Sequence, residues 1–171
     1  MSSRATPPGA AVDVFAEWRA LLAPLMASTP EPLPQSLGRI AASTEAILRS
    51  PYALISAIDE DGALEFFGSD AADPAAVDAL RFLASQDGLS DQVLGRSELL
   101  RLPGSNGLEF DLLNQQSAFA SVLGVPIGYE GRTVGGLYIG RAPDEQPFTS
   151  GEERIAELIA GAAAAVLRRT R

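Results

Sequence analysis

The strongest structural signal in this sequence is a glycine-rich stretch, residues 121–141, which reads SVLGVPIGYEGRTVGGLYIGR. In its first half, apolar side chains alternate with glycine and proline, which is the period-two pattern of a β-strand. Glu130-Gly131 lies between the two halves and has the composition of a two-residue hairpin turn. The stretch therefore predicts a β-hairpin, and any fold of this chain must place that hairpin in a sheet.

The glycines of this hairpin allow two interpretations. A phosphate-binding loop needs its glycines between a strand and a helix, with a Lys in the nucleotide-binding version, and the hairpin meets neither condition. We instead expect Gly124, Gly128 and Gly136 to leave one face of the sheet without projecting side chains, so that a helix packs closely on it. The small residues 161–165, GAAAA, in the last predicted helix offer a matching surface.

Helices and strands are also predicted around the hairpin, after residues 1–10, which we expect to be disordered. The expected helices cover 11–27, 35–49, 73–88, 88–96 and 149–171, and the other expected strands cover 52–59, 63–69 and 99–103. Residues 106–120 mix apolar and amide side chains without a clear period, which fits a short helix inside a long loop. A proline-rich linker, 28–34, separates the first helix from a domain that covers 35–171.

The first helix carries an apolar stripe with no obvious place in the core of that domain. Its members recur at helical spacing and are Val12, Phe15, Trp18, Leu22 and Leu25. Pro24 is expected to kink or end this helix. Because an exposed stripe that contains Trp is unfavourable on a monomer, we expect the stripe to pair with a second copy of the chain in a homodimer.

The residue types that are missing exclude most catalytic and cofactor chemistry. The chain has no His and no Cys, and all 13 of its cationic side chains are Arg. These absences remove the commonest general base, the thiolate nucleophile, the Schiff-base lysine and the usual ligands of zinc and haem. The sequence predicts no catalytic residue, no metal site and no enzyme. The possibility of a hydrolase that uses only carboxylates stays open, but no motif in the sequence supports it.

The charge of the chain bears on its partners and its location. The net charge is −9, which repels nucleic acid and anionic membranes. The one basic cluster, at residues 168–171, is interpreted as a complement to the dipole of the last helix. No apolar run reaches about 18 residues, and MSSRATPPGA lacks the apolar centre of a signal peptide. We therefore expect a cytoplasmic protein that binds neither nucleic acid nor membrane.

Three segments, in this order, resemble a known family. They are GLSDQVLGRSELLRLP (88–103), the hairpin 121–141, and QPFTSGEERIAELIAGAAAAV (146–166). Over about residues 33–168 the chain resembles GAF domains, in particular the GAF modules of actinobacterial oxygen- and redox-sensing histidine kinases. The resemblance implies an α+β fold with a central antiparallel sheet of about six strands. Terminal helices would cover one face, and short helices and loops would cover a small-molecule pocket on the other.

The resemblance also implies a signature near the last helix. Cyclic-nucleotide-binding members share Asn-Lys-Phe-Asp-Glu. Here Arg141 stands in the Lys position, and Phe148, Glu152 and Glu153 keep the spacing of the last three residues. Because this copy is degenerate, we expect it to be structural, with Arg141 and Glu152 as an exposed ion pair worth about 0–1 kcal/mol. Thr149 and Glu152 also have the spacing of a helix capping box.

Other members of the family bind haem through a His in the long loop or depend on Cys for bilin attachment, and this chain has neither residue. We therefore expect no haem and no bilin, but a small organic ligand, of unknown identity, held without a covalent bond. The candidate pocket residues are Phe67, Phe82, Ser85, Phe110, Gln116, Phe119, Ser121 and Tyr138. Each of these aromatic residues also fits an ordinary core position.

These inferences favour a sensory or regulatory module that binds a small molecule and forms a homodimer through its terminal helices. The alternative is a dimerisation or protein-interaction module without a ligand, in signalling or transcriptional regulation. The sequence contains no recognisable output domain. It therefore fits either a stand-alone regulator that acts through a partner protein or a piece of a longer sensor.

Overall fold

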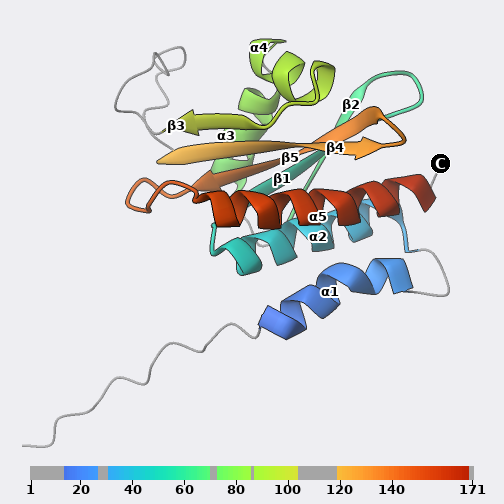
Figure 1. Ribbon diagram of the computed structural model, residues 1–171, viewed down its shortest axis with the longest axis horizontal. Coiled ribbons are helices and arrows are strands. Elements are labelled where there is room, and N and C mark those ends of the chain that lie inside the picture. Colours follow the sequence, from blue (N-terminus) through green and yellow to red (C-terminus); the bar gives the residue numbers. More distant parts are fainter. Residues whose placement is uncertain (1–13, 27–30, 70–72, 86, 104–118, 170–171) are drawn as a thin grey trace, which may run out of the picture.

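The computed structural model describes residues 14–26, 31–69, 73–85, 87–103 and 119–169. They form an α+β fold around a five-stranded antiparallel sheet with the order β2-β1-β5-β4-β3 (Figure 1). The strands are β1 (Tyr52–Ile58), β2 (Leu64–Gly68), β3 (Leu100–Pro103), β4 (Ser121–Tyr129) and β5 (Arg132–Arg141). The predicted fold class is confirmed, with five strands in the described residues where about six were expected.

Helices cover both faces of this sheet, in the arrangement that the resemblance implied. On one face lie α2 (Leu33–Leu48) and α5 (Ser150–Arg169), with α1 (Val14–Met26) beneath them in Figure 1. On the other face lie α3 (Pro74–Ala84), α4 (Asp87–Ser90) and η1, a short π-helix (Asp91–Gly95). None of the helices in the described residues is long and apolar enough to cross a membrane.

The predicted hairpin is formed by β4 and β5, and it places β5 at the centre of the sheet. Its turn residues Glu130 and Gly131 both have positive φ, at 48° and 74°. Two consecutive positive φ angles are typical of the tight turns that match the twist of paired strands. The register shifts between Ile127 and Gly128, so the pairing of this hairpin is irregular close to its turn.

The expectation that the glycines face the last helix is wrong. A Cβ atom added to Gly124 would lie 3.0 Å from the Val93 side chain of η1, and one added to Gly136 would lie 2.9 Å from the Tyr138 ring. Both glycines therefore face the α3 and η1 side, where they leave room for large side chains. The helix α5 covers the opposite face, where it packs on the alternating residues Leu123, Val125 and Ile127.

The first helix joins the core of the domain, which corrects the expectation that it stands apart. Leu21, which is not part of the predicted stripe, is fully buried against α2 and α5, and Trp18 packs on the same core. In contrast, Phe15 is 81% exposed and Leu22 is 41% exposed. The helix thus docks through one side and presents another to solvent. Val12 and the side chain of Leu25 lie outside the described residues.

The boundaries of the first two helices also differ from the prediction. The helix α1 continues past Pro24 to Met26, and α2 begins at Leu33, inside the predicted linker. Pro34 lies in the first turn of α2, where its missing N–H removes no helical hydrogen bond. The part of the linker at residues 28–30 lies outside the described residues, as do residues 1–10 of the expected disordered segment.

Candidate functional site

The candidate ligand site is the sheet face under α3, α4 and η1, where aromatic side chains gather. Tyr52, Phe66, Phe119 and Tyr138 pack there with aliphatic residues of β1, α3, η1 and β4. The Phe119 and Tyr52 rings meet edge to face, with their centroids 5.4 Å apart and an interplanar angle of 73°. Phe119 also lies over Gly140, where an added Cβ would come within 2.5 Å of its ring. The base of the site therefore consists of aromatic rings, and the Phe119 ring has space there because residue 140 is a glycine.

Tyr138 is the polar group at the centre of this face. Its side chain is 1% exposed, and its hydroxyl has no hydrogen-bond partner among the described residues. Burial raises the pKa of Tyr138 to about 12, and the Ser56 hydroxyl acts in the opposite direction. Ser56 Oγ is itself engaged with Gly136, accepting from its N–H at 3.0 Å and donating to its carbonyl at 3.5 Å. The Tyr138 O–H is thus a buried donor that a bound molecule can satisfy.

The structure brings only two of the predicted pocket residues, Phe119 and Tyr138, together on this face. Phe67 packs on the core below α2 and α5, and Ser121 alternates with the β4 residues that face η1, so it points to the α5 side. Because successive side chains of a strand point to opposite faces, these two residues cannot line the same pocket as Tyr138. The prediction that they do is wrong.

The remaining pocket candidates lie elsewhere. Phe82 is 39% exposed on α3, and Ser85 ends that helix with its hydroxyl donating to the carbonyls of Arg81 and Phe82. Neither residue belongs to the buried cluster around Tyr138. Phe110 and Gln116 lie outside the described residues.

Three residues of this face were missed from the sequence: Tyr52, Ser56 and Phe66. In the β1–β5 ladder, Ser56 lies opposite Gly136, and this register is what brings it near Tyr138. The Arg81 guanidinium carbon lies 5.8 Å from the centroid of the Phe66 ring, so a positive charge stands at the rim of the face. The alternation within β1 could have suggested Tyr52, but the register with β5 is not a local property of the sequence.

Two surface grooves lie away from this face. One of about 550 Å³ runs between α2 and the end of β2, beside Gly38, Arg39 and Gly68. The other, of about 300 Å³, lies between β4 and α5, beside Val125 and Gly161. Neither groove contains a residue that the sequence predicted to line a pocket. Among the described residues, no group of acidic side chains is arranged to hold a metal ion.

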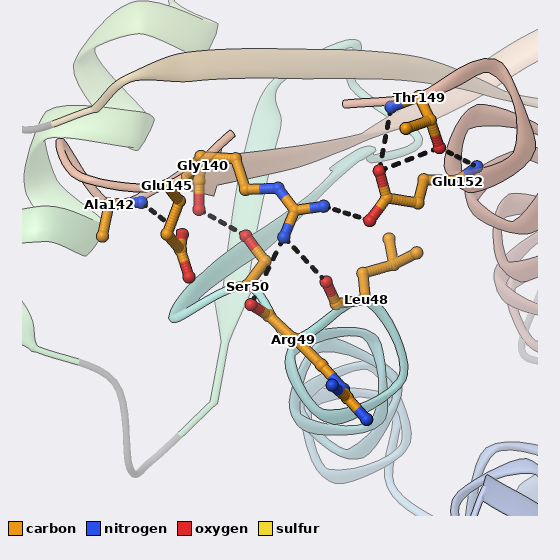
Figure 2. A network of polar contacts seen from close by, with 9 residues as sticks. Leu48, Arg49, Ser50, Gly140, Ala142, Glu145, Thr149 and Glu152 are labelled. Atoms are coloured by element: carbon orange, nitrogen blue, oxygen red, sulfur yellow. Dashed lines mark hydrogen bonds and ion pairs between the residues drawn. The ribbon is translucent and has the colours of Figure 1, made fainter. Parts of the chain in front are cut away.

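Two residues of the degenerate signature, Arg141 and Glu152, form a junction between β5, α2 and α5 (Figure 2). Arg141 Nη1 donates to the carbonyls of Leu48 and Arg49 at 3.1 and 3.4 Å, and its Nη2 pairs with Glu152. The guanidinium carbon lies 4.5 Å from the centroid of the Phe148 ring. Because α2 ends at Leu48, Arg141 satisfies carbonyl groups that the helix leaves open at its end.

The ion pair between Arg141 and Glu152 is present, but the expectation that it is exposed is wrong. The Arg141 side chain is 9% exposed and that of Glu152 is 28% exposed. The predicted capping box is also present, with the Thr149 N–H donating to Glu152 Oε2 at 2.8 Å and the Glu152 N–H donating to Thr149 Oγ1 at 3.2 Å. Burial alone would raise the pKa of Glu152, but the Thr149 hydrogen bonds and Arg141 outweigh it and lower that pKa.

Glu153, the last residue of the signature, has a separate partner. It is buried and pairs with Arg101 of β3, 52 residues away in the sequence. The two consecutive glutamates at the start of α5 therefore each contact an arginine, and the two arginines come from different strands. The arrangement holds α5 on the sheet.

Comparison with known proteins identifies the family and the fold. The GAF domain family model matches residues 32–167. Similar solved structures include the GAF domain of an Acinetobacter phosphoenolpyruvate-protein phosphotransferase, with 18% identity and a TM-score of 0.67 over 92% of this chain and 93% of that one. Another is the GAF domain/HD domain protein from Geobacter sulfurreducens, with 17% identity and a TM-score of 0.66 over 84% and 97%.

A third similar structure is the cyanobacteriochrome TePixJ GAF domain, with 16% identity and a TM-score of 0.63 over 84% of this chain and 96% of that one. No match is found among curated protein sequences. At identities this low the solved structures show a shared fold, and the chemistry of the site must be argued from the residues of this chain.

Proposed function

Because the chain belongs to the GAF family, we propose that it is a sensory module that binds a small molecule without a covalent bond on the sheet face under α3, α4 and η1. GAF domains are typically small-molecule sensory or regulatory modules of signalling proteins. The observation that carries the proposal is the Tyr138 hydroxyl, which is buried among aromatic side chains and has no partner among the described residues. A bound acceptor would remove the free-energy penalty of that buried donor.

The residues on this face favour an uncharged ligand with an aromatic or apolar body and one hydrogen-bond acceptor. With its pKa raised to about 12, Tyr138 stays protonated at neutral pH and acts as a donor. Tyr52 and Phe119 supply aromatic contacts for an apolar body. The full sequence has no Cys or His, so a thioether link and a His-ligated haem are both ruled out for this ligand.

The test is a binding screen with a matched pair of tyrosine variants. Wild-type protein is screened against a panel of metabolites and nucleotides by native mass spectrometry and thermal shift. The Tyr138→Phe variant should bind any hit about five- to tenfold more weakly, because one hydrogen bond is lost. In the control variant, Tyr129→Phe, the lost hydroxyl is exposed at the hairpin turn and bonds to Glu130, so binding should not change. Equal binding by the Tyr138→Phe variant, or no hit in the panel, would refute the proposal.

We further propose that the protein works as a homodimer through α1. Phe15 and Leu22 are seven residues apart, which places them on the same side of the helix, and both are exposed. Leu158 is exposed on α5, which α1 contacts, and could extend the same apolar surface. Trp18 no longer belongs to this proposed interface because it packs on the core of its own chain.

The oligomeric state tests this second proposal. The wild-type protein should sediment as a dimer, and the double variant Phe15→Asp, Leu22→Asp should sediment as a monomer. The control is Phe82→Asp on α3, an exposed aromatic residue on the opposite side of the sheet, which should leave the dimer intact. A monomeric wild type, or a double variant that stays dimeric, would refute the α1 interface.

The alternative proposal is an interaction module without a ligand, whose output belongs to a partner protein. In both versions we propose a cytoplasmic protein without enzymatic activity that binds neither nucleic acid nor membrane. This is supported by a net charge of −9 and by the absence of His, Cys and Lys. A closer relationship to the GAF modules of actinobacterial redox-sensing kinases also stays a proposal, since it depends on the resemblance of residues 88–103, 121–141 and 146–166. A dimer that carries extra mass in native mass spectrometry favours the sensor, whereas a bare dimer favours the interaction module.

A further inference from the structure

The segment from η1 to β3, residues 91–103, carries side chains that lie on both faces of the sheet. Val93 and Leu100 belong to the buried cluster on the aromatic face, which is the face under α3, α4 and η1. Leu99 packs on the other core, under α2 and α5. Arg101 pairs with a glutamate at the start of α5. We call residues 91–103 the linking segment, because it contacts both the proposed ligand face and α5.

The turn between η1 and β3 is closed by hydrogen bonds to η1 itself. The Glu98 N–H donates to the Gln92 carbonyl at 2.9 Å, and the Gln92 side-chain amide donates to the Leu99 carbonyl at 3.0 Å. The Arg96 N–H donates to the Asp91 carbonyl at 2.7 Å, and Arg96 Nε donates to the Asp91 carboxylate at 3.0 Å. A displacement of η1 must therefore either break these bonds or move the residues that lead into β3.

The packing of the linking segment also joins η1 to β3. Both elements lie against Gly124 of β4, where an added Cβ atom would come within 3.0 Å of the Val93 side chain and 3.1 Å of Leu100 Cβ. Val93 is fully buried, so η1 fills the space that this glycine leaves open. Because η1 and β3 share one point of contact with β4, a change at Val93 also changes the surroundings of Leu100.

Two features make the linking segment easier to displace than the centre of the sheet. η1 is a single π-helical turn of five residues, a rare conformation that is frequently found at functional sites. β3 has four residues and lies at the edge of the sheet, where it pairs only with β4 among the described residues (Figure 1). Elements with few bonds open at a lower free-energy cost than strands that are paired on both sides, such as β5.

Arg101 makes the position of β3 important for α5. The Glu153 carboxylate is buried, whereas the Arg101 side chain is 65% exposed. A shift of β3 that draws Arg101 away would leave a buried carboxylate without its charged partner, which destabilises the fold. The neighbouring Glu152 pairs with Arg141 of β5 and does not depend on β3. The first turn of α5 is thus held once from the centre of the sheet and once from its edge.

We propose that the linking segment transmits a displacement of η1 to the start of α5. The trigger rests on the proposed function: Val93 and Tyr138 are 0% and 1% exposed, so a molecule that bonds to the Tyr138 hydroxyl must displace part of its cover. η1 belongs to that cover, since it contacts β4 and β5. Its displacement moves β3, draws Arg101 away from Glu153 and loosens the first turn of α5. The link itself is a property of the free protein and can be tested without a ligand.

Amide hydrogen exchange, followed residue by residue by NMR, tests the link in the free protein. The quantity compared is the ratio of the exchange rates at residues 154–157 to those at residues 163–166, near the other end of α5. Val93→Ala removes two methyl groups from the contact of η1 with β4 and should raise this ratio about three- to tenfold. The control is Leu80→Ala, which removes more atoms from the same buried cluster but lies on α3, and it should leave the ratio unchanged.

A second background tests whether the effect passes through the ion pair. In the double variant Arg101→Met, Glu153→Met both partners are replaced, so no buried charge is left alone. Adding Val93→Ala to this background should change the ratio by less than about twofold. An unchanged ratio in Val93→Ala, an equal rise in Leu80→Ala, or a full rise without the ion pair would each overturn the proposal. Failure of the ligand-binding screen would leave these outcomes unaffected, so the ligand and the link can be refuted separately.

Discussion

The two faces of the central sheet are built from different kinds of residue. The face under α2 and α5 has an aliphatic, alanine-rich core, and charged groups of opposite sign meet at its edge. The face under α3 and η1 has aromatic rings, glycines beneath them and a phenol without a partner among the described residues. The two faces therefore differ in chemistry, and our proposal assigns recognition to the aromatic face and mainly a stabilising role to the other.

The strand β5 shows this division at two consecutive residues. Gly140 leaves space for the Phe119 ring on the aromatic face, and Arg141 contacts α2 and α5 on the other face. Because alternate residues of a strand point to opposite sides, β5 contributes different side chains to the two faces of the sheet. Substitutions along β5 can therefore test whether the two faces are separable.

The largest effect is expected where a substitution damages both faces at once. A Cβ added to Gly135 would lie 2.1 Å from the Ser56 carbonyl oxygen, which is backbone and cannot rotate away. Gly135→Ala should separate β1 from β5 and lower the free energy of unfolding by about 3–5 kcal/mol, which urea denaturation measures. Gly161→Ala is the control, because an added Cβ in α5 has no atom within 4 Å. It should raise stability by up to about 1 kcal/mol. A Gly135→Ala variant as stable as the wild type would contradict the β1–β5 contact.

A smaller effect, confined to the helix face, is expected for Arg141→Met. The change leaves Glu152 and the end of α2 without their partner, and we expect a loss of about 2–3 kcal/mol in unfolding free energy. The near-ultraviolet circular dichroism of the aromatic face should not change. Arg132→Met, at an exposed position on the same strand, should stay within about 0.5 kcal/mol of the wild type. An altered aromatic spectrum in Arg141→Met would show that the faces are not separable.

The reciprocal change, Gly140→Ala, should act mainly on the aromatic face. The added methyl group must displace the Phe119 ring, which ends the edge-to-face contact with Tyr52. We expect a changed near-ultraviolet circular dichroism spectrum and a loss of about 1–2 kcal/mol. Amide hydrogen exchange in α5 should stay as in the wild type. Faster exchange at the start of α5 would instead indicate that the two faces are coupled through β5.

The sequence was sufficient for the features that depend on near neighbours. The hairpin turn at Glu130-Gly131 and the capping box at Thr149 and Glu152 are both local patterns, and both are present. The face on which the glycines lie was not predictable, because it depends on which helices pack on which side. The contact between Arg101 and Glu153 was missed for the same reason, since it joins residues from distant parts of the chain.

The first helix shows how a periodic pattern can indicate the wrong side. Its apolar residues occupy two sides, so the stripe through Phe15, Trp18 and Leu22 did not include Leu21, which is the buried contact. Burial of Leu21 depends on the surface that α2 and α5 present, and that surface is a tertiary property. In the candidate site, Tyr138 and Phe119 were predicted, but the register that places Ser56 beside Tyr138 was not.

The smallest expected effect is a pH dependence that belongs to the helix face. The pKa of Glu152 is lower in the folded chain, so its ionisation stabilises the fold above the unfolded value near 4.5, and that stability is lost as pH falls through the folded value. The pKa of Glu45 is raised by burial, while the nearby Ser69 hydroxyl and a hydrogen bond from the Ala53 N–H act to lower it, so Glu45 acts in the opposite direction.

The comparison of wild type with Glu152→Gln isolates the Glu152 contribution, because Glu45 is the same in both proteins. Unfolding free energy measured from neutral pH to pH 3 should fall more steeply for the wild type than for the variant. Parallel curves would mean that Arg141 and Thr149 do not favour the charged form of Glu152. Because Tyr138 stays protonated over this whole range, the aromatic face should contribute nothing to the difference, and its near-ultraviolet spectrum should be the same for both proteins while they remain folded.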